Sequence, residues 1–255
     1  MSEEILINVT PQETRIAVVE NGVLQEVLIE RARARGLVGN LYKGVVSRVL
    51  PGMQAAFIDI GLERAAFLHA SDILAREVEG LSPEGRRTET ISQLLREGQE
   101  LLVQVIKDPL GTKGARLTTH ITIPSRYLVF MPDAVNVGVS QKIEGEAERT
   151  RLKETVLRHG NGEAQGFIVR TAAEGVADEA LIADMEFLRK LWASVRERAQ
   201  SAAPGGIVHE DLPLALRVLR DLVSDEIDKV RIDSRETFQR VSAFAQDFIP
   251  EVCER

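Results

Sequence analysis

A hairpin pattern between residues 55 and 69 constrains this chain more than any other feature. Two short apolar runs are bounded by turn residues, which is typical of a pair of β-strands. Side chains alternate between the two faces of a strand, so one face of the first run is apolar and predicts a core: Ala56, Ile58 and Ile60. Phe57 falls on the opposite, polar face. The expected hairpin register places Phe67 directly across from it.

Two interpretations of this phenylalanine pair are open. The rings could belong to a second core beneath a neighbouring domain. Alternatively, they could stack on bases, because small OB-type barrels bind single-stranded nucleic acid with exposed aromatics and a positive rim. Basic residues gather around the hairpin in sequence: Arg31, Arg33, Arg35, Lys43, Arg48, Arg64, Lys107, Lys113 and Arg116.

Five sequence blocks, taken in order, resemble the RNase E/RNase G endoribonuclease family, and its RNase G branch in particular. The resemblance covers the whole chain, and the blocks that carry it are residues 5–10, 40–44 with 51–61, 113–119, 127–132 and 167–172. The block containing Phe57 resembles the opening of the family's S1-type OB domain. The resemblance therefore favours the base-stacking interpretation.

The pattern of strands and helices predicts an α+β, multi-domain fold. A three-stranded meander with an Asn21-Gly22 hairpin turn needs a helical cover, and the next helices that could supply one lie near the C-terminus. We therefore expect a discontinuous outer domain, which the resemblance implies is RNase H-like. The expected parts are the outer domain (1–35 and 210–255), an S1-type OB-fold barrel (36–120) and an α+β 5′-sensor unit (121–209).

The last 55 residues are expected to begin with a linker and to supply the helical cover. Residues 201–206 have the composition of a linker. Asp211 is expected to cap a helix that buries one stripe of residues: Leu216, Leu219, Val223 and Ile227. A short strand at 230–232 should lead to a second helix, capped by Ser234, with a buried stripe of Phe238, Val241, Ala245 and Phe248.

Arg170 and Thr171 follow a buried strand and are candidates for binding phosphate. A guanidinium can donate two parallel hydrogen bonds to a phosphate, although a lone arginine at a strand end more often forms a surface salt bridge. The resemblance implies that this pair holds the 5′-monophosphate of RNA, together with the backbone amide of Val129. It also implies a basic RNA contact at Lys142, where a close relative has arginine.

The resemblance also assigns roles to three residues of the barrel. Phe57 and Phe67 are expected to stack on bases near the scissile bond, and Lys113 is expected to contact RNA. Stacking on an aromatic side chain contributes about 1–3 kcal/mol per base with little sequence preference. These roles are implied by the family and do not follow from periodicity.

Composition limits the classes of function. A net charge of −7 argues against a protein that coats nucleic acid indiscriminately, so RNA contacts should be local and salt-sensitive. A single cysteine, Cys253, and four histidines provide neither a disulfide framework nor zinc-ligand spacing. The N-terminus has no signal-peptide pattern and no apolar run is long enough to span a bilayer. We expect a cytoplasmic protein with no membrane partner.

No catalytic or metal-ligating residue is predicted in this chain. The family hydrolyses RNA with Mg²⁺ held by two aspartates of a DNase I-like domain, followed by a structural Zn²⁺ link. The resemblance implies that both lie beyond residue 255 in a full-length protein. The available carboxylates do not match that motif: Asp59, Asp108, Asp225, Asp228 and Asp233.

Two functions are considered. The chain is expected to be the substrate-binding half of an RNase G-type enzyme that cleaves 5′-monophosphorylated single-stranded RNA in rRNA maturation and mRNA decay. This half alone should be inactive, and it should be monomeric although the full-length enzyme is a homo-oligomer. The alternative is a stand-alone RNA-binding adaptor without a nuclease domain.

Overall fold

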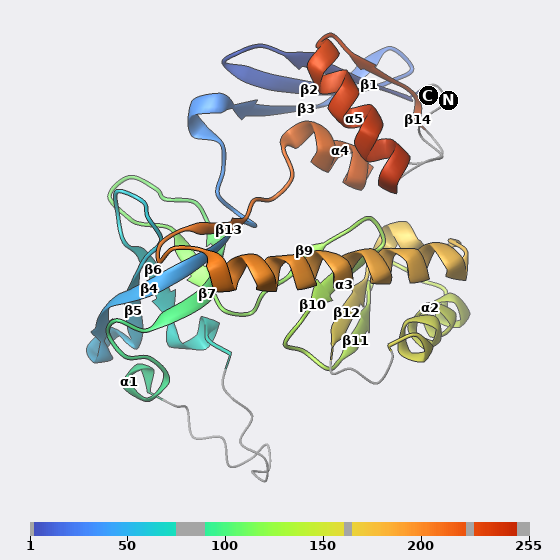
Figure 1. The fold of residues 1–255 in the computed structure, drawn as a ribbon. Coiled ribbons are helices and arrows are strands. Elements are labelled where there is room, and N and C mark those ends of the chain that lie inside the picture. Colours follow the sequence, from blue (N-terminus) through green and yellow to red (C-terminus); the bar gives the residue numbers. More distant parts are fainter. Residues whose placement is uncertain (1–2, 75–89, 161–164, 223–226, 249–255) are drawn as a thin grey trace. The chain divides into compact units, whose positions relative to one another are not determined.

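The computed structural model describes residues 3–74, 90–160, 165–222 and 227–248. The chain divides into two compact units, an outer unit of residues 1–36 with 212–255 and a central unit of residues 37–211. Each unit is drawn in Figure 1. Cys253 and Asp225 lie outside the described residues.

The outer unit contains a four-stranded sheet in the order β14-β1-β2-β3. Strands β1 (Glu3–Val9), β2 (Glu13–Glu20) and β3 (Val23–Arg31) form the antiparallel meander, and β14 (Ile227–Ile232) runs parallel to β1. Asn21 and Gly22 both have positive φ (48° and 80°), as a tight hairpin turn requires. Helices α4 (Leu214–Leu222) and α5 (Arg235–Phe248) share a hydrophobic core with the sheet, so the C-terminal segment covers the meander.

Two details of this segment differ from the sequence prediction. Helix α4 begins at Leu214, whose amide N–H donates to the Glu30 carboxylate at 3.2 Å, so Asp211 is not its cap. Ile227 lies in β14 instead of on the helix, paired with Glu3 of β1. The predicted partner Val223 falls outside the described residues.

Helix α5 is capped as predicted but buries a different stripe. The Thr237 amide N–H donates to Ser234 Oγ at 3.3 Å. The buried positions are Thr237, Val241 and Ala245, spaced four residues apart, and Phe238 lies one position off this stripe and is 54% exposed. The prediction of a buried Phe238 was therefore wrong, and the Phe248 side chain lies outside what the structure describes.

The first lobe of the central unit is a closed five-stranded barrel, as predicted. Its strands are β4 (Leu41–Leu50), β5 (Ala55–Asp59), β6 (Ala66–His69), β7 (Glu100–Lys107) and β8 (Arg116–Thr118). They pair in the order β4-β5-β6-β8-β7, and β4 pairs again with β7 to close the barrel. A one-turn helix, α1 (Ile91–Leu94), with a Thr90/Gln93 capping box, packs Ile91 into the barrel core.

The second lobe of the central unit, called here the α+β lobe, has a sheet in the order β11-β12-β10-β9. Its strands are β9 (Ile123–Pro124), β10 (Leu128–Met131), β11 (Val137–Val139) and β12 (Gly166–Val169). Helices α2 (Glu146–Arg158) and α3 (Asp178–Ser201) pack on this sheet. An apolar stripe of α3 is buried at Leu181, Met185, Leu188 and Val195, while Trp192 lies edge-on to Phe130 at 6.3 Å between ring centroids.

The predicted linker at 201–206 is bonded to the barrel. The Gly205 amide N–H donates to the Lys43 carbonyl at 2.7 Å, and the Lys43 amide N–H donates to the Gly206 carbonyl at 2.9 Å. Strand β13 (Ile207–His209) then pairs with β4. A Cβ on Gly61 would lie 2.6 Å from the Gly205 carbonyl oxygen, so this close approach requires glycine. The two lobes are thus joined through backbone contacts.

Candidate nucleic-acid interface

The phenylalanine pair lies on the outer face of the barrel. Phe57 of β5 pairs with Phe67 of β6, as the hairpin register predicted, with ring centroids 6.3 Å apart and planes inclined at 70°. Both side chains are partly exposed, whereas the residues of the opposite face are buried: Ala56, Ile58, Ala66 and Leu68. Among the described residues, neither ring belongs to any of the three hydrophobic core clusters. Both rings are therefore accessible at the barrel surface.

Cationic residues extend this pair into a row across the barrel. Arg48 of β4 lies opposite Phe57, Arg116 of β8 lies opposite Phe67, and Lys107 of β7 lies opposite Arg116. Residues in register on neighbouring strands present their side chains on one face of a sheet. We call this set of five the barrel row. The two aromatic rings lie in the middle of the row, and positively charged side chains lie at both ends.

Two β-bulges create the barrel row. The register shifts between Val46 and Arg48, and again between Val105 and Lys107, so each strand gains one residue relative to its neighbour. A bulge re-aims the side chains that follow it. Arg48 and Lys107 are among the basic residues that gather around the hairpin in sequence, but strict alternation does not place them in register with the rings.

Lys113 lies in the turn that precedes β8. It is exposed, and its amide N–H donates to the Leu110 carbonyl at 3.0 Å. The next residue, Gly114, packs so tightly on Ala65 that an added Cβ would lie 2.0 Å from the Ala65 carbonyl oxygen. Since Ala65 directly precedes β6, this contact brings Lys113 to the strand that carries Phe67.

Arg116 in the barrel row is held by an acidic neighbour. Its Nε and Nη2 donate to Asp72 Oδ2 at 3.1 and 2.9 Å, and its side chain stays 41% exposed. A paired arginine is fixed in orientation but presents less net charge than an unpaired one. Most of the positive charge of the row therefore comes from Arg48 and Lys107, which are both exposed.

A second cluster lies at the end of β12 in the α+β lobe. The amide N–H of Arg170 donates to the Tyr127 carbonyl at 2.8 Å, and Nη1 donates to the carbonyls of Ser125 (2.5 Å) and Arg126 (3.4 Å). The guanidinium is thus docked on the 125–127 loop and is half-buried. An arginine at a strand end commonly forms an exposed ion pair, whereas the contacts described for this guanidinium include two backbone carbonyls.

Thr171 and Lys142 meet through a serine. Thr171 Oγ1 lies 3.0 Å from Ser140 Oγ, which also accepts the Lys142 amide N–H at 3.3 Å. Thr171 and Lys142 are exposed. The structure therefore brings three predicted residues, Arg170, Thr171 and Lys142, to one end of the sheet. Ser140 was not predicted, because an isolated serine after a short strand has no distinguishing sequence signal.

Val129 occupies the middle of the same sheet. It pairs with Ile168 on one side and Pro124 on the other. Since Arg170 N–H donates to Tyr127, the alternation of antiparallel ladders places Val129 and Ile168 in a hydrogen-bonded pair. The predicted role of the Val129 amide in phosphate binding therefore requires this ladder bond to be shared or released.

Glu148 of α2 supports the turn that follows Thr171. Its Oε1 accepts the Gly175 amide N–H at 2.9 Å, and its carboxylate accepts two hydrogen bonds from Arg151 at 2.7 and 2.8 Å. The hydrogen bonds from Arg151, with that from Gly175, lower the pKa of Glu148 to about 2. The charged form of Glu148 is therefore the form that stabilises the fold.

We expect the Glu148→Gln variant to lose about 1–2 kcal/mol of unfolding free energy at pH 7, because charge-assisted hydrogen bonds are replaced by neutral ones at a partly exposed site. The contribution of a carboxylate with a lowered pKa is present above its unfolded pKa and is lost as the pH falls. The difference between the two proteins should thus shrink from pH 4.5 towards about 2. Urea unfolding at several pH values measures it. Glu154→Gln, an exposed change on the same helix, is the control, and a difference independent of pH would refute the assignment.

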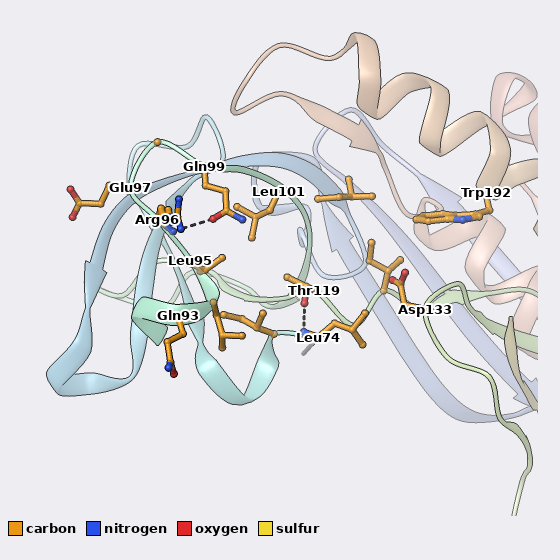
Figure 2. Close-up of a pocket in the computed structure, with 15 residues that line it drawn as sticks. Leu74, Gln93, Leu95, Arg96, Glu97, Gln99, Leu101, Thr119, Asp133 and Trp192 are labelled. Carbon is orange, nitrogen blue, oxygen red and sulfur yellow. Dashed lines mark hydrogen bonds between the residues drawn. The ribbon is translucent and has the colours of Figure 1, made fainter. Parts of the chain in front are cut away.

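The central unit also contains a cavity of about 1080 Å³, and Figure 2 shows the residues that line it. Leu74, Leu95 and Leu101 line it from the barrel, and Asp133 and Trp192 line it from the α+β lobe. Burial raises the pKa of Asp133, while the charge of His120 opposes the shift. None of the predicted site residues lines this cavity.

Among the residues that the structure describes, no three histidine, cysteine, aspartate or glutamate side chains are grouped to hold a metal ion. Within the same residues, no helix is long and apolar enough to cross a membrane.

Two protein families match this chain and identify the class of protein to which it belongs. Residues 37–119 match the S1 RNA binding domain, which is the closed barrel that carries the barrel row. Residues 122–255 match the Ribonuclease E/G family. The chain belongs to this family, and the resemblance noted in the sequence is confirmed.

Individual relatives agree with this assignment. Ribonuclease G of Escherichia coli strain K12 is 54% identical over 257 residues, covering 100% of this chain and 52% of the relative. Ribonuclease G of Haemophilus influenzae is 53% identical over 99% of this chain and 52% of its own length. Ribonuclease E of Nostoc sp. is 37% identical over 97% of this chain and 35% of its own length. The chain thus spans about half the length of the ribonuclease G relatives.

Proposed function

We propose that this chain is the substrate-binding half of an RNase G-type endoribonuclease and binds single-stranded RNA together with its 5′-monophosphate end. The observation that carries the proposal is the barrel row, in which two half-exposed rings are flanked by cations on an S1 domain. In this proposal the full-length enzyme cleaves the bound RNA, which agrees with the name of the ribonuclease G relatives. We further propose that this cleavage serves rRNA maturation and mRNA decay.

The chemistry of the row favours single strands. Bases can stack on Phe57 and Phe67 only when they are not already stacked inside a duplex, and each stacked base contributes about 1–3 kcal/mol. Arg48 and Lys107 at the two ends neutralise backbone phosphates, and Lys113 adds charge beside Phe67. Because the net charge of the protein is −7, this attraction is confined to the site.

The 5′ end is assigned to the cluster in the α+β lobe. Arg170 supplies a fixed guanidinium, Thr171 a hydroxyl and Lys142 a charge, with Val129 as a further backbone contact.

In this proposal the α+β lobe is the 5′ sensor and the outer unit is RNase H-like. The full-length enzyme would use Mg²⁺ for hydrolysis and would contain a structural Zn²⁺, and no residue of this chain is proposed to hold either ion. The enzyme is cytoplasmic and homo-oligomeric when full-length, whereas this part is monomeric.

We expect a single-stranded RNA with a 5′-hydroxyl to bind at least about tenfold more tightly than a duplex of the same sequence, because only the single strand can place bases on the rings. Fluorescence anisotropy at two salt concentrations measures both affinities. The 5′-hydroxyl end isolates the barrel from the second cluster. Equal binding of both nucleic acids would show a general basic surface and contradict the proposal.

A further inference from the structure

The 125–127 loop is held between two side chains of opposite charge. On one side, the Arg170 guanidinium donates to the carbonyls of Ser125 and Arg126. On the other side, Asp184 Oδ2 accepts hydrogen bonds from Ser125 Oγ at 2.5 Å and from the Tyr127 amide N–H at 3.0 Å. The loop therefore links an acid of α3 to the arginine at the end of β12.

Asp184 lies where burial disfavours the ionised form of its carboxyl group. It projects from α3 between buried positions of the helix stripe, Leu181, Met185 and Leu188. Desolvation raises the pKa of Asp184, and the hydrogen bonds from Ser125 and the loop amides, with the charge of Arg170, oppose the shift. A carboxylate in such surroundings is tolerated only when its bonds are satisfied. Here the compensating bonds come from the same loop that receives Arg170.

We propose that Asp184 is a positioning residue for phosphate recognition, which fixes the 125–127 loop and thereby orients the guanidinium of Arg170. This inference rests on the proposed function of Arg170. It adds a residue of α3 that has no place in the phosphate-binding set of Arg170, Thr171, Lys142 and Val129.

Asp184 affects the orientation of the Arg170 guanidinium through the carbonyls of the 125–127 loop. A guanidinium carries five N–H groups in one rigid plane, so fixing Nη1 on the loop carbonyls fixes the direction of the whole group. An arginine that is already oriented loses less conformational freedom when a phosphate binds. Without Asp184, the Ser125 hydroxyl and the Tyr127 amide lose their shared acceptor. The loop then keeps its bonds from Ser125 to the Leu128 carbonyl and from the Arg170 amide N–H to the Tyr127 carbonyl, so its carbonyls should hold the guanidinium less firmly.

The test uses two variants, Asp184→Ala and Asp184→Asn, and the control Glu186→Ala, which removes an exposed acid from the same helix. For each protein, the affinities for 5′-monophosphate and 5′-hydroxyl forms of one oligonucleotide are measured, and folding is checked by circular dichroism and thermal melting. The ratio of the two affinities reports on phosphate recognition. A purely structural role would weaken both affinities together.

We expect Asp184→Ala to reduce the monophosphate preference tenfold or to abolish it, with unchanged affinity for the 5′-hydroxyl form. Asp184→Asn keeps one acceptor oxygen but loses the charge that faces Arg170, so its preference for the monophosphate should fall about threefold. The asparagine variant should therefore retain part of the preference that the alanine variant loses. Glu186→Ala should behave as wild type. If Asp184→Ala does not fold, the asparagine variant alone decides the outcome.

Two failures are distinguishable. A folded Asp184 variant with a wild-type preference would overturn the positioning role and leave the proposed function intact. A wild-type protein with no preference for the monophosphate would instead overturn the sensor function on which the inference rests.

Discussion

Replacing Phe57 and Phe67 together with alanine is expected to weaken single-stranded RNA binding by about 2–5 kcal/mol and to leave the barrel folded. The two rings are half-exposed neighbours at the centre of the barrel row, whereas the packing of the barrel depends on the opposite faces of the same strands. Their removal therefore deletes two stacking surfaces without opening a cavity in the core.

Anisotropy with a 5′-hydroxyl oligonucleotide measures this effect, and circular dichroism checks the fold. Phe238→Ala is the matched control, since Phe238 is an exposed phenylalanine of the outer unit, 54% exposed, and outside the barrel row. The control should bind RNA as wild type does. An unfolded double mutant would mean that the rings are core residues, and a folded double mutant with normal binding would show that bases do not stack there.

Local patterns predicted much of the architecture. The Asn21-Gly22 turn and the alternation around Phe57 each depend on neighbours close in sequence, and each is found as expected. The need of the meander for a cover also pointed to the C-terminal segment, which supplies β14 and two helices.

The remaining features depend on contacts between distant residues. The Glu30 carboxylate binds the start of α4, and no local pattern near Asp211 indicates this. The bulge that aligns Arg48 with Phe57 lies in β4, which pairs with both β5 and β7 in the closed barrel. Likewise, the docking of Arg170 on Ser125 and the grouping of Thr171 with Ser140 join segments more than 30 residues apart.

Replacing Arg170 with alanine is expected to abolish recognition of the 5′-monophosphate. A terminal monophosphate presents oxygens that a guanidinium can bind through two parallel hydrogen bonds, with Thr171 beside it. Each charge-assisted bond contributes about 1.5–3 kcal/mol, and solvent screening at this half-buried site should leave a preference of about ten- to a hundredfold. A 5′-hydroxyl offers no such charge, and a triphosphate is larger than a site with so few donors can accommodate.

The matched control is Arg158→Ala, which removes one positive charge from an exposed position of α2 in the same lobe. It should retain the full preference for the monophosphate, because a general loss of charge weakens all RNA ends alike. The Glu148→Gln variant provides a second comparison for the monophosphate preference, since it loosens the turn after Thr171 without removing the guanidinium of Arg170.

The most direct test of the account measures the binding of one oligonucleotide with 5′-hydroxyl, 5′-monophosphate and 5′-triphosphate ends to the wild type and to Arg170→Ala. We expect the wild type to bind the monophosphate form about ten- to a hundredfold more tightly than the other two. The variant should bind all three forms equally, with the affinity that the barrel alone provides. A variant in which all three affinities fall by the same factor, so that the preference persists, would contradict the account, because Arg170 would then be part of a general RNA surface.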